Sequence, residues 1–310
     1  MQLADRIMET IPGLTGFVDF HYYGETFQTW YRVVGEPRIE ACCLVILHGG
    51  SAIPNPYLNP HIDLTTSRNI PVIFYDQIGC GQSTHLREKP AEFFTINLFM
   101  NQLDDLLDKL GVSDNFDLYG HSWGGMLVSD YVASRRPKGL KRLIIANAPA
   151  SIPLFIKCVE KLFDKMPPGL AERIRRHEIE GTTDDAEYKE ATQRFFMKHI
   201  CSVEPMPDSV SAAFKALRED KTVYNALWGP YEMEFSGSLA TWSVVEKLHS
   251  IIVPTLVLNG QDDEMQDECV SPFLWGIDKV KWVRLAKSGH MPFYEEKDRY
   301  FQVIGEFLRP

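Results

Sequence analysis

Short runs of consecutive apolar residues recur along the chain, instead of alternating apolar and polar positions. The runs span residues 41–47, 72–75, 116–119, 143–146, 255–258 and 282–285. Continuous apolarity is typical of strands that are covered on both faces, as in a parallel sheet. We therefore expect each run to form a buried strand.

Helical periodicity fills the intervals between these runs. Apolar residues at 98, 103, 106, 107 and 110 repeat at steps of three and four, and Gly111 supplies a stop signal. Residues 127–132 and 300–308 also present apolar helical faces. Alternation of strands and helices predicts an α/β fold, a mostly parallel sheet flanked by helices.

The alternation stops in the middle of the chain. Residues from about 150 to 248 are helical in pattern, charged and interrupted by prolines, without a clear buried strand. We expect an α/β core made of residues 1–149 and 249–310, with an inserted helical cap at 150–248.

Composition narrows the range of functions. The 310 residues carry a formal charge of -10 and no cluster of Lys and Arg, which disfavours nucleic acid and anionic membranes as partners. No apolar stretch approaches the roughly 20 residues of a membrane span, and the N-terminus lacks a signal-peptide pattern. The six cysteines show no C-x-x-C spacing, so we expect no metal and no cofactor. A cytoplasmic enzyme is the expectation, and the oligomeric state stays unassigned.

One short motif indicates which catalytic chemistry to expect. Gly120-His121-Ser122-Trp123-Gly124 fits G-x-S-x-G, with an apolar strand before it and an apolar helix after it. In this context the serine lies on a strained strand-to-helix turn with its hydroxyl exposed. The motif predicts Ser122 as a nucleophile and the Trp123 N–H as an oxyanion donor. A glycine-rich turn with a passive serine is the alternative, which the flanking strand and helix disfavour.

A serine nucleophile needs a base and an acid that orients the base. In this fold the chain order is serine, acid, histidine, each after a strand. Of nine histidines, His290 follows the last expected strand beside a glycine. Asp262 and Asp263 both follow the strand at 255–258, and spacing alone leaves both open as the acid. His121 is interpreted as the variable residue of the motif.

A second glycine-rich loop follows the strand at 41–47. His48-Gly49-Gly50-Ser51 can free a backbone N–H to complete an oxyanion hole with that of Trp123. We expect Gly50 to be this donor.

Several longer stretches, spread over most of the chain, are similar to those of a known family. They are GETFQTWYRVVGE (24–36), LHGG (47–50), YDQIGCGQSTH (75–85), GHSWGGML (120–127), GPYEMEFSGSLATW (229–242) and SGHMPFYEE (288–296). On these stretches the chain resembles the proline iminopeptidases and, more closely, the related L-amino-acid amidases (L-proline amide hydrolases).

The resemblance implies an α/β-hydrolase fold with a helical cap over the site. It implies Asp263 as the acid, because the family acid is the third residue after the glycine that ends the strand. It further implies that cap glutamates bind a free α-amine, with Glu232 of the G-P-x-E stretch as the first candidate and Glu204 as the second. The chain departs from the family in reading HGGSA where HGGPG is common, and in having Asp262 before the acid. These departures leave the identity of the substrate open.

The leading hypothesis is a serine hydrolase that cleaves the amide or peptide bond after an N-terminal amino acid with a free amine. Its partner is then a small molecule or short peptide. An esterase or thioesterase, or a biosynthetic hydrolase or acyl transferase acting on a peptide-like metabolite, is the enzymatic alternative. A non-catalytic ligand-binding receptor on the same fold is the alternative from another class.

Overall fold

The protein is described by a computed structural model over residues 13–36, 42–230 and 235–309. Within these ranges one eight-stranded sheet has the order β1-β2-β4-β3-β5-β6-β7-β8. β1 pairs antiparallel with β2, β2 pairs antiparallel with β4, and the remaining neighbours are parallel. The strands are β1 (Leu14–Tyr22), β2 (Glu25–Val34), β3 (Cys43–Leu47), β4 (Val72–Tyr75), β5 (Phe116–His121), β6 (Leu140–Ala146), β7 (Thr255–Gly260) and β8 (Val280–Leu285).

The six predicted runs form β3 to β8, and the expected α/β class with a mostly parallel sheet is confirmed. The expectation of a buried strand is wrong for β8, which lies at the end of the sheet and buries only Leu285. The hairpin of β1 and β2 was not among the predicted strands. Its residues alternate between exposed and buried positions toward the edge of the sheet, so they form no continuous apolar run.

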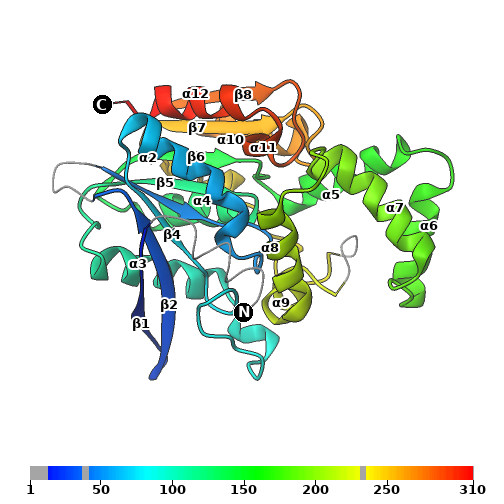
Figure 1. The fold of residues 1–310 in the computed structure, drawn as a ribbon, viewed down its shortest axis with the longest axis horizontal. Helices are drawn as coiled ribbons and strands as arrows, with labels where there is room; N and C mark the ends of the chain where they lie inside the picture. The colour runs from blue at the N-terminus through cyan, green and yellow to red at the C-terminus, as the bar shows by residue number, and fades with distance from the viewer. Residues whose placement is uncertain (1–12, 37–41, 231–234, 310) are drawn as a thin grey trace.

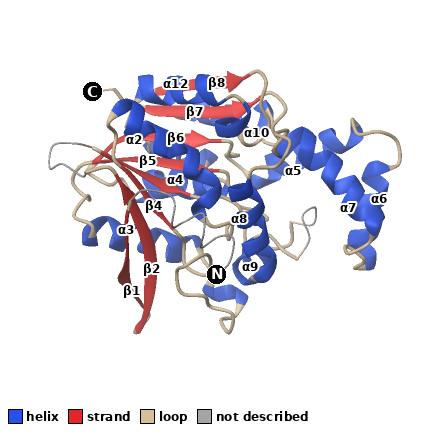
Figure 2. Ribbon diagram, viewed as in Figure 1, coloured by secondary structure: helices blue, strands red, loops and turns tan. Residues whose placement is uncertain are grey.

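Helices cover both faces of the sheet, as Figure 2 shows. Val45 and Leu118 pack with α3 (Ile96–Lys109), α4 (Trp123–Arg135) and α10 (Asp267–Gly276) on one face. Ile46 and Tyr119 pack with η1 (Asn55–Ile62), α2 (Asp63–Arg68) and α12 (Lys297–Phe307) on the other. Neighbouring residues of β3 and β5 therefore contribute to opposite cores, which is why these two central strands are buried along their whole length. The Gly111 stop is confirmed, because α3 ends at Lys109 and Gly111 has φ 66°.

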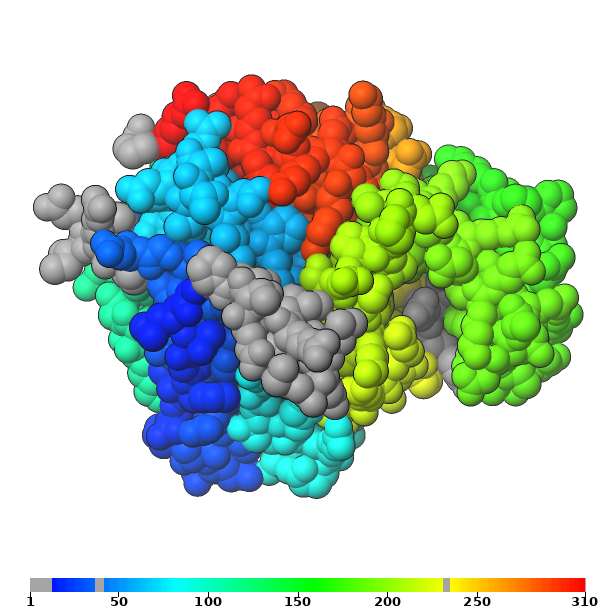
Figure 3. Space-filling model, viewed as in Figure 1, coloured from blue at the N-terminus to red at the C-terminus, as the bar shows by residue number. Residues whose placement is uncertain are grey.

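The chain between β6 and β7 is helical and extends to one side of the sheet (Figure 1). It contains α5 (Ile152–Asp164), α6 (Leu170–Glu180), α7 (Ala186–Phe195), the π-helix η3 (Phe196–Ile200), α8 (Asp208–Glu219), α9 (Thr222–Leu227) and η4 (Val245–Ser250). A hollow separates the α6–α7 arm from the α8–α9 segment in the space-filling view (Figure 3). This arrangement supports the boundaries 150–248 for a cap, which remain a proposal.

None of the helices in the described ranges combines the length and the apolar composition that crossing a membrane requires.

Candidate active site

Ser122 occupies the sharp turn between β5 and α4. β5 ends at His121 and α4 begins at Trp123, so the serine alone connects strand to helix. Its backbone has φ 55° and ψ -122°, a conformation that costs energy for a residue with a Cβ. The Ser122 N–H donates to the carbonyl of Ala146 at 2.9 Å, which ties the turn to the end of β6. The strain is therefore held in place by the sheet around it.

Two glycines of the motif allow this turn to form. A Cβ on Gly120 would lie 2.2 Å from the carbonyl oxygen of Gly124. A Cβ on Gly124 would lie 2.3 Å from the carbonyl oxygen of Leu47 at the end of β3. Strand, helix and neighbouring strand thus approach to distances that exclude any side chain at these positions.

Asp263 and His290 are brought together from the ends of β7 and β8. The His290 Nδ1–H donates to Asp263 Oδ1 at 2.8 Å, and the Asp263 side chain is fully buried. Asp263 Oδ1 also accepts the Met265 N–H at 2.9 Å, and Oδ2 accepts from Asn147 Nδ2 at 2.7 Å. The adjacent Asp262 is exposed. The geometry thus pairs His290 with Asp263, the choice that spacing alone left open.

The surroundings of His290 favour its protonated form. Burial alone would lower the pKa of this imidazole, but the charge and hydrogen bond of Asp263 outweigh it and raise the pKa. Glu264 and Glu295 add to the increase. An imidazolium is the species that forms when a base takes the proton of a serine hydroxyl. The site is therefore preorganised for that charge.

His121 joins the serine turn to the histidine loop. Its Nε2–H donates to the His290 carbonyl at 2.9 Å, and the two imidazole rings have centroids 4.7 Å apart. Burial lowers the pKa of His121 well below the usual value, so the ring is neutral and its Nδ1 accepts the Tyr57 hydroxyl at 2.9 Å. Ser122 and His290 form no direct hydrogen bond within the described ranges. In free hydrolases this contact is often loose and tightens when substrate binds.

The loop after β3 lies against the serine turn. A Cβ on Gly49 would lie 2.8 Å from the Cβ of Ser122 and 3.0 Å from the carbonyl oxygen of His121, so the loop packs directly against the serine turn. The Gly49 N–H is engaged by the Tyr57 hydroxyl at 2.7 Å. The N–H groups of Gly50 and Trp123 have no acceptor among the described residues. Their assignment as oxyanion donors remains a prediction.

Sequence reasoning missed a residue that connects the two donor loops. Gln77 Nε2 donates to the His48 carbonyl at 2.9 Å, and Gln77 Oε1 accepts the Trp123 indole N–H at 2.8 Å. Its backbone N–H also donates to His48 Nε2 at 2.9 Å. Gln77 lies within the YDQIGCGQSTH stretch, but its position in the sequence gives no sign of these distant contacts.

Tyr57 and Asn147 were missed for the same reason. Their partners Gly49, His121 and Asp263 are brought near only by the fold. His121 itself was interpreted as a variable residue, and the structure shows it buried between two loops.

The structure adds little evidence for the two predicted amine-binding glutamates. Glu232 lies outside the described residues. Glu204 is exposed on the bend between η3 and α8. Both assignments remain predictions.

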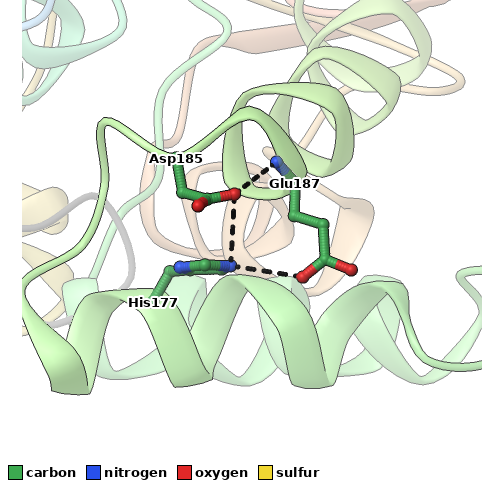
Figure 4. A group of neighbouring side chains, drawn as sticks. All are labelled: His177, Asp185 and Glu187. Atoms are coloured by element: carbon green, nitrogen blue, oxygen red, sulfur yellow. Dashed lines mark hydrogen bonds and ion pairs between the residues drawn. The ribbon is translucent and has the colours of Figure 1, made fainter.

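One group of side chains in the described ranges has metal-ligand geometry. His177 Nε2 lies 3.6 Å from a Glu187 carboxylate oxygen and 4.0 Å from one of Asp185, as Figure 4 shows. The Arg176 guanidinium donates to Glu187 at 2.5 Å and lies 3.1 Å from His177 Nε2. A protein cation therefore already faces these ligand atoms, and the group is an ion-pair cluster that joins α6 to α7.

Comparisons with known proteins agree with this fold. A family model described as alpha/beta hydrolase fold matches residues 43–297. The proline iminopeptidase of Saccharolobus solfataricus is 34% identical over 278 residues, covering 90% of this chain and 87% of that protein.

Two crystal structures are similar along nearly the whole chain. A protein named VinJ is 40% identical, with a TM-score of 0.91 and coverage of 96% of this chain and 99% of that chain. The proline iminopeptidase of Mycobacterium smegmatis is 31% identical, with a TM-score of 0.87 and coverage of 94% and 97%.

Proposed function

Because the chain belongs to the α/β-hydrolase fold family, and within it to the proline iminopeptidases, we propose that it cleaves the bond after an N-terminal amino acid with a free amine. The observation that supports this most is the buried Asp263–His290 pair beside Ser122 on its strained turn. These residues have the roles of acid, base and nucleophile, and the bond broken is an amide or peptide bond.

The reaction follows from the positions of these groups. Ser122 Oγ attacks the substrate carbonyl while His290 Nε2 takes the hydroxyl proton. The N–H groups of Gly50 and Trp123 bind the oxyanion, and each such donor typically contributes 10²- to 10³-fold in rate. The C–N bond breaks as His290 passes its proton to the leaving nitrogen. Water then attacks the acyl-enzyme, with His290 as base, and releases the amino acid and Ser122.

Substrate selection belongs to the helical segment above this machinery. Glu232 and Glu204 are the proposed partners of the substrate ammonium group, which a carboxylate binds through charge-assisted hydrogen bonds. A cavity of about 260 Å³ lies between α5 and α6, with Ile156, Val159, Phe163 and Phe235 among its apolar walls. Its lining also includes Glu160, Arg175 and Glu178 and no residue of the loops that carry Ser122, Asp263 and His290, so no part of the substrate is assigned to it.

The proposed substrate is a small molecule or short peptide, without nucleic acid or membrane as partner. A cytoplasmic location is part of the proposal, since all six cysteines are free and a reducing compartment keeps thiols in that state.

The decisive experiment compares free and blocked substrates. Prolyl and alanyl arylamides, prolinamide and their N-acetylated forms are incubated with the protein and with Ser122→Ala. Cleavage of the free-amine compounds alone, lost in the variant, is the expected result. Equal cleavage of acetylated compounds would contradict the amine requirement. If a fluorophosphonate labelled Ser122 but none of these compounds were cleaved, Ser122 would be a reactive nucleophile and the proposed substrate class would be wrong.

A further inference from the structure

A single turn of the cap contacts both loops that hold the acid and the base. The His290 backbone N–H donates to the carbonyls of His199 and Ile200, at 3.0 and 3.1 Å, in the π-helix η3. The His199 Nδ1–H donates to the Asp262 carbonyl at 2.7 Å, one residue before the acid. Short π-helices frequently occur at functional sites. In this structure η3 therefore holds the loop that carries the acid and the loop that carries the base, both from the side of the cap.

The Glu295 carboxylate extends this contact beyond the turn. One of its oxygens, Oε2, accepts the N–H groups of Gly289 and Met291, at 2.9 and 3.2 Å, on both sides of His290. The other, Oε1, accepts the N–H and the hydroxyl of Ser202 at 2.9 and 2.8 Å. One oxygen serves the histidine loop and the other serves the cap. The carboxylate thus bridges the two with four charge-assisted hydrogen bonds.

We propose that Glu295 is a positioning residue that couples Ser202 of the cap to the His290 loop, so that the base is aligned only while this cap segment is seated. The inference rests on the proposed function, because it concerns the same base. Small displacements of a positioned group can cost about 10²-fold in rate. A bridge at this place therefore affects kcat more than substrate binding.

The bridge also lies close to a predicted substrate contact. Glu204 is two residues beyond Ser202. An ammonium group held by Glu204 would bias the same segment toward its seated position. Binding energy from a part of the substrate that does not react would then be used to align the base.

Replacing Glu295 by glutamine is a specific test of the bridge between Ser202 and the His290 loop. Glutamine keeps one acceptor oxygen, so it satisfies only one of the two sides and presents an NH₂ group to the N–H donors of the other. The neighbouring Glu296 offers a matched control. Its Oε2 accepts the Lys287 N–H at 2.9 Å and the Ser288 hydroxyl at 3.2 Å, within the same loop, and its described bonds do not reach the cap.

The two variants also differ in their effect on the base. The groups around His290 include Asp263, Glu264, Glu295 and the neutral His121, and the charge of Glu295 contributes to its raised pKa. Removing that charge lowers the pKa, so the acid limb of the kcat/KM profile moves to lower pH. Glu296 has no such contribution among the causes of that shift.

The experiment measures kcat, KM and the pH profile on a prolyl arylamide for wild type, Glu295→Gln, Glu296→Gln and Ser202→Ala. We expect Glu295→Gln to lose about tenfold or more in kcat with little change in KM, and to shift its acid limb downward. Ser202→Ala should lose less, with an unmoved limb, since the carboxylate remains. Glu296→Gln should stay within about threefold of wild type.

Equal kcat losses and equal acid limbs in Glu295→Gln and Glu296→Gln would overturn the coupling. If Glu295→Gln does not fold, as judged by circular dichroism, the comparison of Ser202→Ala with Glu296→Gln decides, and equal activities reject the proposal. If wild type cleaves no aminoacyl arylamide, the proposed function fails. The rate of fluorophosphonate labelling at Ser122 then replaces kcat, with the same expected order of variants.

Discussion

At the scale of single residues, the carboxylate of Asp263 is defined by three donors. The His290 imidazole, the Met265 N–H and the Asn147 amide all point at it, and none of them contacts the side chain of Asp262. Two adjacent aspartates that spacing alone cannot distinguish therefore differ completely in environment. Burial with full hydrogen bonding keeps Asp263 able to orient the base and stabilise its charge.

This difference predicts opposite outcomes for two neighbouring substitutions. Asp263→Asn should lower kcat by about 10⁴-fold, because an amide favours the wrong imidazole tautomer and removes the charge that raises the pKa of His290. Asp262→Asn should leave kcat within a few fold. Steady-state kinetics on a free-amine arylamide, with circular dichroism to verify folding, measure both. Similar losses in the two variants would mean that Asp262 shares the role of the acid.

Residues whose partners are distant in the sequence mark the limit of what the sequence predicts. Ser122 and His290 were identified because short local patterns place each one just after a strand. Gln77, Tyr57 and His121 act through partners up to 169 positions away, as in the bond from His121 to the His290 carbonyl. A single sequence contains no record of such distances, so these supports appear only in the folded chain.

At the scale of elements, the approach of α4 to the end of β3 determines where the nucleophile lies. The close packing at Gly124 leaves no space for a methyl group, because its nearest neighbours are backbone oxygens of Leu47 and His48. Backbone cannot rotate away as a flexible side chain can. The predicted strand–turn–helix pattern therefore depends on this glycine as much as on the apolar periodicity.

Gly124→Ala should consequently displace α4 and the serine turn together. We expect a loss of about 2–4 kcal/mol in the free energy of unfolding, typical of steric overpacking against rigid groups. Fluorophosphonate labelling of Ser122 should slow in the folded fraction. Ser134→Ala, at an exposed position of the same helix, is the control; it removes a hydroxyl that donates to Asp130 at 2.8 Å and should cost only about 1 kcal/mol. Urea denaturation compares them, and an unchanged Gly124→Ala midpoint would contradict the packing argument.

At the scale of the whole molecule, the apolar runs predicted the core better than the periphery. Buried parallel strands can be predicted from their continuous apolar composition, whereas the β1–β2 hairpin is half exposed and shows no continuous apolar run. The helical insertion was predicted from an absence of strands, but its attachments to the core were not. These attachments include η3 and Ser202 on one side and the segment before β7 on the other.

The second attachment gives a prediction for how the insertion is held. Asp130 of α4 is buried, and its carboxylate accepts from the Trp242 indole at 3.1 Å and from Lys247 at 2.9 Å. The Lys247 side chain is half exposed, so solvent weakens that ion pair and most of the effect comes from the buried indole N–H that loses its acceptor. Asp130→Ala should therefore cost about 1–3 kcal/mol. Limited proteolysis should cut residues 150–248 sooner in this variant than in wild type.

The exposed Glu246, beside Lys247, supplies the control for this experiment, since Glu246→Ala removes a carboxylate from the same segment without a buried partner. Cleavage within 150–248 that accelerates in Asp130→Ala but not in Glu246→Ala would show that the buried carboxylate secures the insertion to the core. Acceleration spread evenly over the chain would instead indicate global destabilisation, and the attachment would have no separate role. Because substrate selection is proposed for this insertion, loosening it should also raise KM for free-amine substrates more than it slows fluorophosphonate labelling of Ser122.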